Sequence, residues 1–142
     1  YGLPMVYLDE NARLGASELD TWAEIPRDVV TRAITDALVA TGRFRDAGNA
    51  AAMARPDLLL TGELRKFLEN RTVSPRTAEI EVRFELREAR GANCLWAETL
   101  RVERPLDKQS AAALAAAMNE AVGQVVSQAA AAIAKAVPDA AP

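Results

Sequence analysis

The feature that most constrains the fold is an unbroken alternation of apolar and charged residues over residues 77–88. Successive side chains of a β-strand point to opposite faces of a sheet, so this period predicts a strand with one dry and one wet face. The dry-face residues are Ala78, Ile80, Val82, Phe84 and Leu86, and the wet-face residues are Glu79, Glu81, Arg83, Glu85 and Arg87. Such a strand requires a second layer of structure over its dry face.

Two more extended segments flank this strand, over residues 57–69 and 94–104, and short turns separate the three. They predict an antiparallel meander. In the first segment Glu69 falls on the polar face, while Gly62 falls on the apolar face and suggests a bulge or a close approach of another element. In the last segment Cys94 is expected to be buried as a small apolar side chain. Glu98 falls on the same side, which suggests a bulge or an edge position.

Two amphipathic helices can supply the cover. The first is predicted over residues 26–41, with Pro26 in its first turn and Gly42 just past its end. The second is predicted to run to about Val137, with Asp107 or Ser110 as its cap. We therefore expect an α+β domain over residues 1–137, in which two main helices pack on one face of a mainly antiparallel sheet. Residues 138–142 are expected to form a disordered tail.

The other segments carry weaker signals. Residues 3–8 contain Pro4, which favours an edge strand or an irregular start, and residues 9–20 suggest a loop or a weak hairpin. A short strand is predicted over residues 43–47, and one helical turn over residues 49–54. The residues expected in or near the core are Trp22, Pro26, Ile34, Leu38, Leu60, Val82, Phe84, Trp96, Val122 and Val125.

Composition excludes several kinds of chemistry. The chain has no histidine and one cysteine, which removes histidine-based acid–base catalysis and any intrachain disulfide. Its net charge of −3 gives no indication of a nucleic-acid-binding face. No motif predicts a cofactor or a metal ion, so we expect neither, and we do not expect an enzyme.

Two groups of residues could have a functional role in place of a purely structural one. The acidic residues Asp9, Glu10, Glu18 and Asp20 could supply a hydrolase acid–base pair, although a solvated acidic loop is the favoured interpretation. The two tryptophans, Trp22 and Trp96, could line a ligand groove, although anchoring between helix and sheet is favoured.

Several short segments, taken in order, resemble one family. The most specific are the Trp-Ala-Glu-Ile-Pro helix start at residues 22–26 and the Gly-Arg-Phe helix exit at residues 42–44. The others are Tyr7-Leu8-Asp9, residues 56–64, Leu95-Trp96 and residues 116–122. Together they resemble the ABC-type transport auxiliary lipoproteins, the PqiC-like group.

The resemblance implies a non-catalytic periplasmic lipoprotein that is tethered to the outer membrane by an N-terminal lipid. It would act as an adaptor or docking subunit for an Mce-domain substrate-binding protein of an ABC transporter that moves lipids. Because the chain starts at Tyr1 and not at Met, we expect the signal, the lipid anchor and part of the first strand to lie upstream.

The residues expected at the partner interface are Tyr7, Asp9, Arg83, Glu85 and Arg87. An alternative function is a lipid-binding periplasmic carrier that holds an acyl chain between the sheet and the helices. Assembly into a homo-oligomer also stays open.

Overall fold

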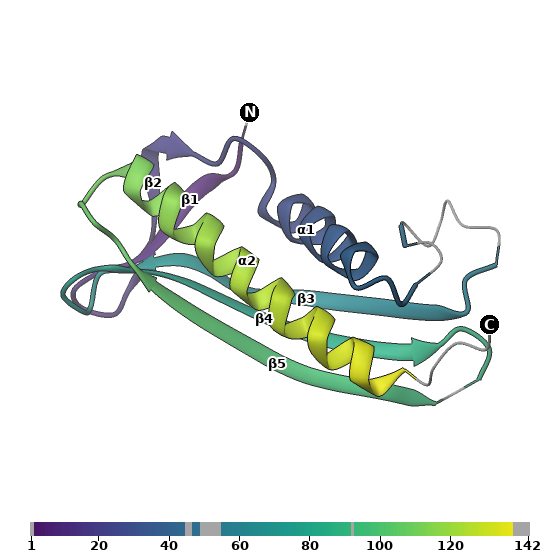
Figure 1. Ribbon diagram of the computed structural model, residues 1–142. Helices are drawn as coiled ribbons and strands as arrows, with labels where there is room; N and C mark the ends of the chain where they lie inside the picture. Colours follow the sequence, from purple (N-terminus) through teal and green to yellow (C-terminus); the bar gives the residue numbers. More distant parts are fainter. Residues whose placement is uncertain (1, 45–46, 49–54, 92, 138–142) are drawn as a thin grey trace.

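The computed structural model describes residues 2–44, 47–48, 55–91 and 93–137. These residues form five strands and two helices (Figure 1). The strands are β1 (Pro4–Leu8), β2 (Leu14–Thr21), β3 (Leu58–Asn70), β4 (Thr77–Glu88) and β5 (Cys94–Pro105), and the helices are α1 (Pro26–Ala40) and α2 (Ala111–Ala136).

All five strands belong to one sheet, in the order β2-β1-β3-β4-β5. Every neighbouring pair is antiparallel except β1 and β3, which run parallel. Both helices lie on the same side of this sheet (Figure 1). The predicted α+β class and two-layer arrangement are therefore confirmed.

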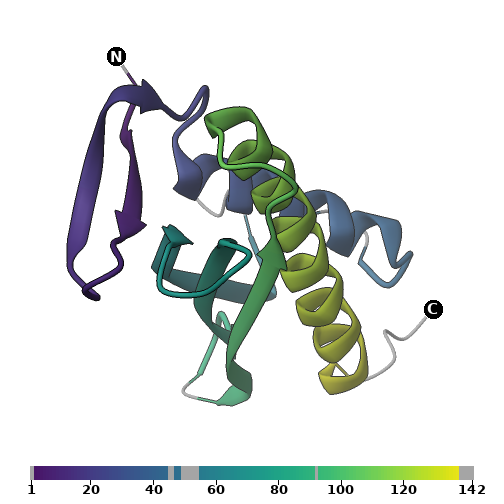
Figure 2. The ribbon, with the colours of Figure 1, turned by 90° about the vertical axis from the view of Figure 1, so that its left-hand side faces the viewer.

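The core forms where α2 crosses β4 and β5 (Figure 2). Ser110 caps this helix, because its side chain accepts a hydrogen bond from the backbone N–H of Ala113 at 3.1 Å. Ala121 and Ala129 are completely buried on the sheet-facing side. Their small side chains let the helix lie close to the dry face of β4, which is buried from Ala78 to Leu86 at every second residue.

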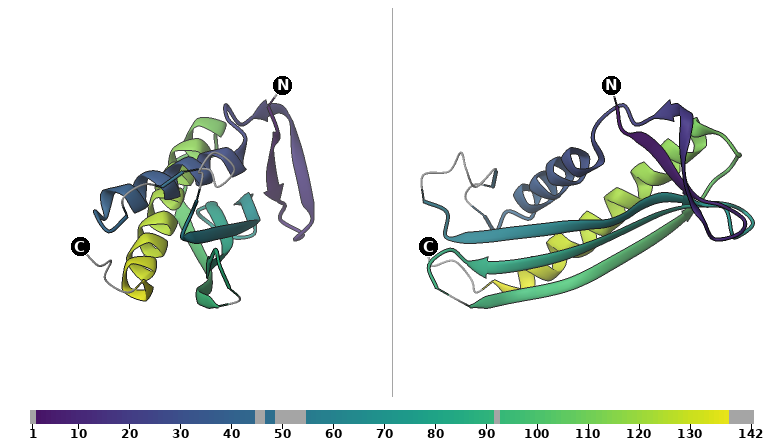
Figure 3. Two further views of the ribbon diagram at one scale, coloured as in Figure 1. Left: turned by 90° about the vertical axis from the view of Figure 1, so that its right-hand side faces the viewer. Right: turned by 180° about the vertical axis from the view of Figure 1, so that it is seen from behind.

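Helix α1 packs against α2 and extends above the β3 side of the sheet (Figures 1 and 3). Pro26 occupies its first turn, and Gly42 follows its end with a φ of 71°. A positive φ is freely adopted by glycine and terminates a helix, so both predicted boundaries are confirmed within one residue.

The core positions are confirmed as buried or packed against the core. Trp22, Leu38, Leu60 and Trp96 are half-buried. The fully buried ones are Pro26, Ile34, Val82, Phe84, Val122 and Val125.

A bulge in β3 changes which side chains face the helices. Leu64 pairs with Val82, but Lys66 pairs with Glu81, so Arg65 is the extra residue. Beyond this point Glu69 pairs with the buried Ala78 and lies on the helix side of the sheet. The predicted wet-face position of Glu69 is therefore wrong. The prediction of a bulge at Gly62 is also wrong, because Gly62 pairs regularly with Phe84.

A second bulge lies in β5. Trp96 pairs with Leu86 and Cys94 pairs with Arg87, so Leu95 is the extra residue. Cys94 is consequently on the charged face and exposed, and the prediction that it is buried is wrong. The prediction that Glu98 marks a bulged or edge strand is confirmed, since β5 is both.

The N-terminal segment differs from expectation in one respect. β1 and β2 form the predicted hairpin, but β1 lies between β2 and β3, so the edge-strand alternative is wrong. The alternative of an irregular start is confirmed, since the register with β2 shifts between Pro4 and Val6. Of the short strand predicted over residues 43–47, the described residues 43, 44 and 47 are not in a strand. The helical turn at residues 49–54 and the tail at residues 138–142 lie outside the described residues.

Candidate functional site

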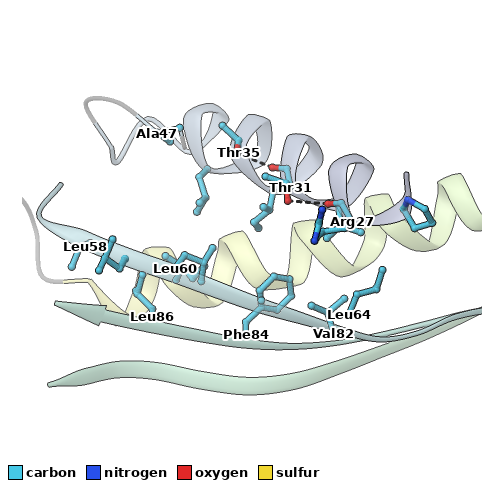
Figure 4. A pocket seen from close by; sticks show the side chains of 18 of the residues that line it. Arg27, Thr31, Thr35, Ala47, Leu58, Leu60, Leu64, Val82, Phe84 and Leu86 are labelled. Atoms are coloured by element: carbon cyan, nitrogen blue, oxygen red, sulfur yellow. Dashed lines mark hydrogen bonds between the residues drawn. The ribbon is translucent and has the colours of Figure 1, made fainter. Parts of the chain in front are cut away.

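A cleft of about 1680 Å³ separates α1 from the sheet. Its floor consists of leucines from β3 and of apolar side chains from β4 that point toward α1 (Figure 4). These floor residues are Leu58, Leu60, Leu64, Val82, Phe84 and Leu86. The roof includes Val30, Ile34 and Leu38 from the apolar stripe of α1. The cleft exists because α1 rests on α2 and does not close down on β3.

Aromatic side chains border the cleft near β1. Trp22 and Phe67 meet edge to face with their ring centroids 4.9 Å apart. The backbone N–H of Trp22 donates to the carbonyl of Leu3 at 3.0 Å, which ties the start of α1 to the start of β1. Trp22 therefore combines both roles considered from the sequence, since it anchors the helix and lines a groove.

The charged lining of the cleft is predominantly basic. Four arginines line it and one described carboxylate, Asp57, accompanies them. The arginines are Arg27, Arg43, Arg55 and Arg65. An apolar interior with cationic side chains suits an occupant that is apolar along its length and anionic at an end or side.

The polar groups of α1 that line the cleft are satisfied within the helix. The Thr31 hydroxyl donates to the carbonyl of Arg27 at 2.9 Å, and the Thr35 hydroxyl donates to the carbonyl of Thr31 at 2.8 Å (Figure 4). Neither hydroxyl needs a partner from an occupant. This part of the cleft is therefore built for apolar contact.

An exposed ion pair braces the first turns of α1. Arg32 donates to both oxygens of Glu24, at 2.6 and 3.1 Å, and these hydrogen bonds hold the pKa of Glu24 below its usual value. We expect Arg32→Gln to return the pKa of Glu24 upward in an NMR carboxyl titration. Because the folded-state pKa of Glu24 is the lower one, the pair stabilises the fold above the unfolded-state pKa. That stabilisation is lost as the pH falls through the folded-state pKa. An unchanged pKa in Arg32→Gln would contradict the assigned cause.

Three of the predicted interface residues lie together on the outer face of the sheet, away from the helices. They are Arg83, Glu85 and Arg87 on β4, and Glu85 and Arg87 form a 3.8 Å ion pair. Neighbouring strands continue the pattern: Glu63 is the cross-strand partner of Arg83 in β3, and Arg101 of β5 donates to Glu81 at 2.9 and 3.0 Å. The hydrogen bond from Arg101 to Glu81 raises the pKa of Arg101. We call Arg83, Glu85 and Arg87 with these neighbours the charged outer face.

Tyr7 and Asp9 lie elsewhere. The guanidinium of Arg71 stands 3.8 Å above the Tyr7 ring, and Tyr7 pairs with Glu69 on the helix side of the sheet. Asp9 accepts the backbone N–H groups of Asn11 and Arg13, both at 2.9 Å, and so shapes the β1–β2 turn. The structure does not bring these two residues together with the charged outer face.

A buried cluster of charged side chains around the Glu69 carboxylate was not predicted from the sequence. Glu69 is 4% exposed; Arg71 donates to it at 2.7 Å, and Arg76 forms an ion pair with it at 3.9 Å. With Tyr7 beneath Arg71, the cluster fastens β1 to β3. The bulge that places Glu69 there could have been recognised from two adjacent charged residues, Arg65 and Lys66. A regular strand would put one of them on its dry face.

The acidic residues that could have supplied a hydrolase acid–base pair do not form a catalytic site. Asp9 accepts backbone hydrogen bonds within the β1–β2 turn, and Asp20 accepts a hydrogen bond from the Ser17 hydroxyl at 3.4 Å. Glu10 and Glu18 are exposed. In the described part of the chain, no group of three or more histidine, cysteine or acidic side chains is placed to hold a metal ion. Nor does any helix there have the length and apolarity needed to cross a membrane.

The fold matches several solved structures. A Xanthomonas campestris protein assigned to the DUF330 family model superposes with a TM-score of 0.83 at 21% identity, over 95% of this chain and 76% of that one. An uncharacterized protein gives a TM-score of 0.67 at 15% identity, over 94% and 80% of the two chains. A hypothetical protein of Chlamydia trachomatis gives 0.54 at 12% identity, over 90% and 92%. A comparison with curated protein sequences gives no match.

The family comparison covers most of the chain. The model for the ABC-type transport auxiliary lipoprotein component matches residues 4–130, from the start of β1 to the last turns of α2. The match therefore includes every strand, α1, the charged outer face and most of the residues that line the cleft. The chain belongs to the ABC-type transport auxiliary lipoprotein component family.

Proposed function

We propose that this auxiliary lipoprotein component acts as a non-catalytic adaptor in the periplasm, where it docks an Mce-domain substrate-binding protein of a lipid-transporting ABC system. In this role an N-terminal lipid anchors it to the outer membrane. The observation that carries the proposal is the charged outer face, which the helices leave uncovered because both pack on the other side of the sheet.

The charged outer face has the properties of a docking surface. Its charges alternate in sign along β4 and across to β3 and β5. Alternating charges select a partner with the complementary pattern, and they fix its register more than they add raw affinity. Binding through such a face is expected to weaken as salt is added, because exposed charges are screened over about 8 Å at physiological ionic strength.

Co-purification tests this role. We expect an Mce-domain protein encoded beside this gene to be retained by the chain, and the double variant Arg83→Glu/Arg87→Glu to weaken retention by about tenfold or more. The matched control is Lys108→Glu/Lys135→Glu, which changes the net charge equally at exposed positions outside β3, β4 and β5. Equal retention of both variants, or no retention by the unaltered chain, would contradict the proposal.

The cleft favours a second candidate, a carrier that holds an acyl chain between α1 and the sheet. Its apolar floor and roof would surround the chain, and its arginines would meet an anionic headgroup. Native mass spectrometry of protein taken from the cell envelope should then show bound lipid. Thr31→Trp, which projects into the cleft, should remove that lipid, whereas Asp36→Trp on the exposed side of α1 should not. Lipid-free protein would exclude the carrier role.

A further inference from the structure

One arginine of the charged outer face has no partner for its side chain. Of the three arginines of this face, Arg87 forms an ion pair with Glu85 at 3.8 Å. Arg101 donates to Glu81 at 2.9 and 3.0 Å. The Arg83 side chain forms neither a hydrogen bond nor an ion pair with any residue that the structure describes. All the N–H donors of its guanidinium are therefore available to a ligand.

The carboxylates beside Arg83 in the sheet are engaged by other arginines. Glu81 and Glu85 lie two residues away on the same strand face, and Glu63 is the cross-strand partner in β3. Glu81 and Glu85 have the partners just described, and Glu63 forms an ion pair with Arg65 at 3.6 Å. The charges of these three pairs cancel, so Arg83 is the one positive charge of this group that stays uncompensated.

The position of Arg83 is also that of a strong contact. It lies in the middle of β4, which has a strand on each side, and it is half-buried. Arginine is enriched among the few interface residues that dominate binding energy, and these lie near the centre of an interface among weaker contacts. The neighbouring pair of Glu85 and Arg87 is exposed, and exposed ion pairs contribute little.

We propose that Arg83 is the principal contact of the charged outer face with the docked protein, and that its guanidinium binds a carboxylate side chain of that protein. The inference rests on the adaptor role and adds the chemistry of the partner to it. A planar guanidinium holds a carboxylate through two parallel N–H···O hydrogen bonds.

Two observations favour a protein carboxylate over the phosphate of a lipid. The face carries alternating charges, whereas a bound acyl chain requires an apolar lining. In addition, Glu63, Glu81 and Glu85 lie around Arg83 and disfavour a ligand with more than one negative charge. The partner surface is therefore expected to present a single acidic side chain opposite Arg83.

The first test begins with the chain alone. In nuclear magnetic resonance of the 142-residue chain, the Nε–H proton of Arg83 should exchange with water at least about tenfold faster than that of Arg101, whose Nε donates to Glu81. Addition of the Mce-domain protein encoded beside this gene should slow the exchange of the Arg83 proton by a similar factor. An Arg83 proton that is as protected as the Arg101 proton in the unbound chain would overturn the proposal.

Binding measurements test the role of Arg83 in docking. Arg83→Gln should raise the Kd for the Mce-domain protein by at least about 30-fold, because the partner carboxylate loses its ligand. The matched control is Arg87→Gln, which removes the same charge from the same face and should raise the Kd by less than about fivefold. The thermal midpoints of both variants should stay within about 2 °C of that of the unaltered chain.

A selection identifies the partner group. Partner variants that recover binding to Arg83→Glu should carry a basic residue in place of an acidic one, because the exchange restores an ion pair of opposite polarity. Recovery only through changes that leave every acidic residue of the partner in place would contradict the assignment of a carboxylate.

The failure of this inference is distinguishable from the failure of the adaptor role. Tight binding by Arg83→Gln, or equal weakening by Arg83→Gln and Arg87→Gln, would overturn the inference and leave the adaptor role in place. No binding of the Mce-domain protein by the unaltered chain would overturn the adaptor role, and this inference with it. Arg83-dependent binding to phosphatidylglycerol vesicles would assign Arg83 to a lipid headgroup and would also overturn the inference.

Discussion

Replacing Phe84 by alanine should lower the free energy of unfolding by about 3–5 kcal/mol in denaturant melts. Phe84 is 2% exposed at the centre of β4, and its ring stacks on Trp96 with the centroids 6.0 Å apart. It also forms part of the cleft floor. The substitution therefore removes apolar contacts with the core and leaves a cavity that the surrounding strands cannot readily fill.

The neighbouring Glu85→Ala is the matched control, since it lies on the same strand with its side chain on the charged outer face. It should change stability by no more than about 0.5 kcal/mol. A cost for Phe84→Ala below about 1 kcal/mol would contradict the placement of Phe84 in a packed core, and would indicate that the cleft collapses to fill the space.

Enlarging Ala121 to phenylalanine should destabilise the chain by about 1–3 kcal/mol, toward the upper end of the range for overpacking. Ala121 is completely buried between α2 and the sheet, so a ring at this position forces the helix outward. The thermal midpoint should fall accordingly, and the floor of the cleft should be disturbed with it.

Ala116→Phe provides the comparison, because Ala116 is exposed on the same helix. Both substitutions carry the same loss of helix propensity, at most about 0.7 kcal/mol, so the difference between them isolates packing. Equal stabilities of the two variants would show that α2 does not rest closely on β4 and β5.

The regular parts of this fold could be predicted because each carries a periodic signal of adequate length. β4 alternates without interruption, and its bounds were predicted correctly. The helices were predicted from their apolar stripes and from Pro26, Gly42 and the two candidate caps Asp107 and Ser110 at their ends, of which Ser110 is the cap. The strand faces near the two bulges could not be predicted in the same way. One extra residue, at Arg65 or at Leu95, reverses the alternation of faces between the residues before it and the residues after it.

The cleft could not be predicted from the periodicity of the sequence, for a different reason. Its apolar residues look like ordinary core positions, since Ile34, Leu60 and Phe84 would be expected to touch one another in a closed two-layer domain. Whether α1 closes on β3 depends on its packing against α2. This is a property of the assembled molecule, and no local pattern encodes it.

The sequence pattern grouped only three of the five predicted interface residues. Arg83, Glu85 and Arg87 share one strand face because they lie two residues apart, and this was visible in the sequence. Tyr7 and Asp9 were predicted as part of a separate edge near the N-terminus, and no periodic pattern joined them to that face. In the structure Tyr7 lies on the other face of the sheet under Arg71, and Asp9 shapes a turn. Of the two groups, the charged outer face is therefore the stronger candidate for docking.

Site-specific photo-crosslinking in living cells tests the adaptor role most directly. A photoreactive amino acid replaces Glu85 on the charged outer face or, as the control, Gln124 on the exposed side of α2. The account predicts a crosslink to an Mce-domain protein from position 85 and none from position 124. Crosslinks to that protein from position 124 alone, or from neither position, would contradict docking through the charged outer face.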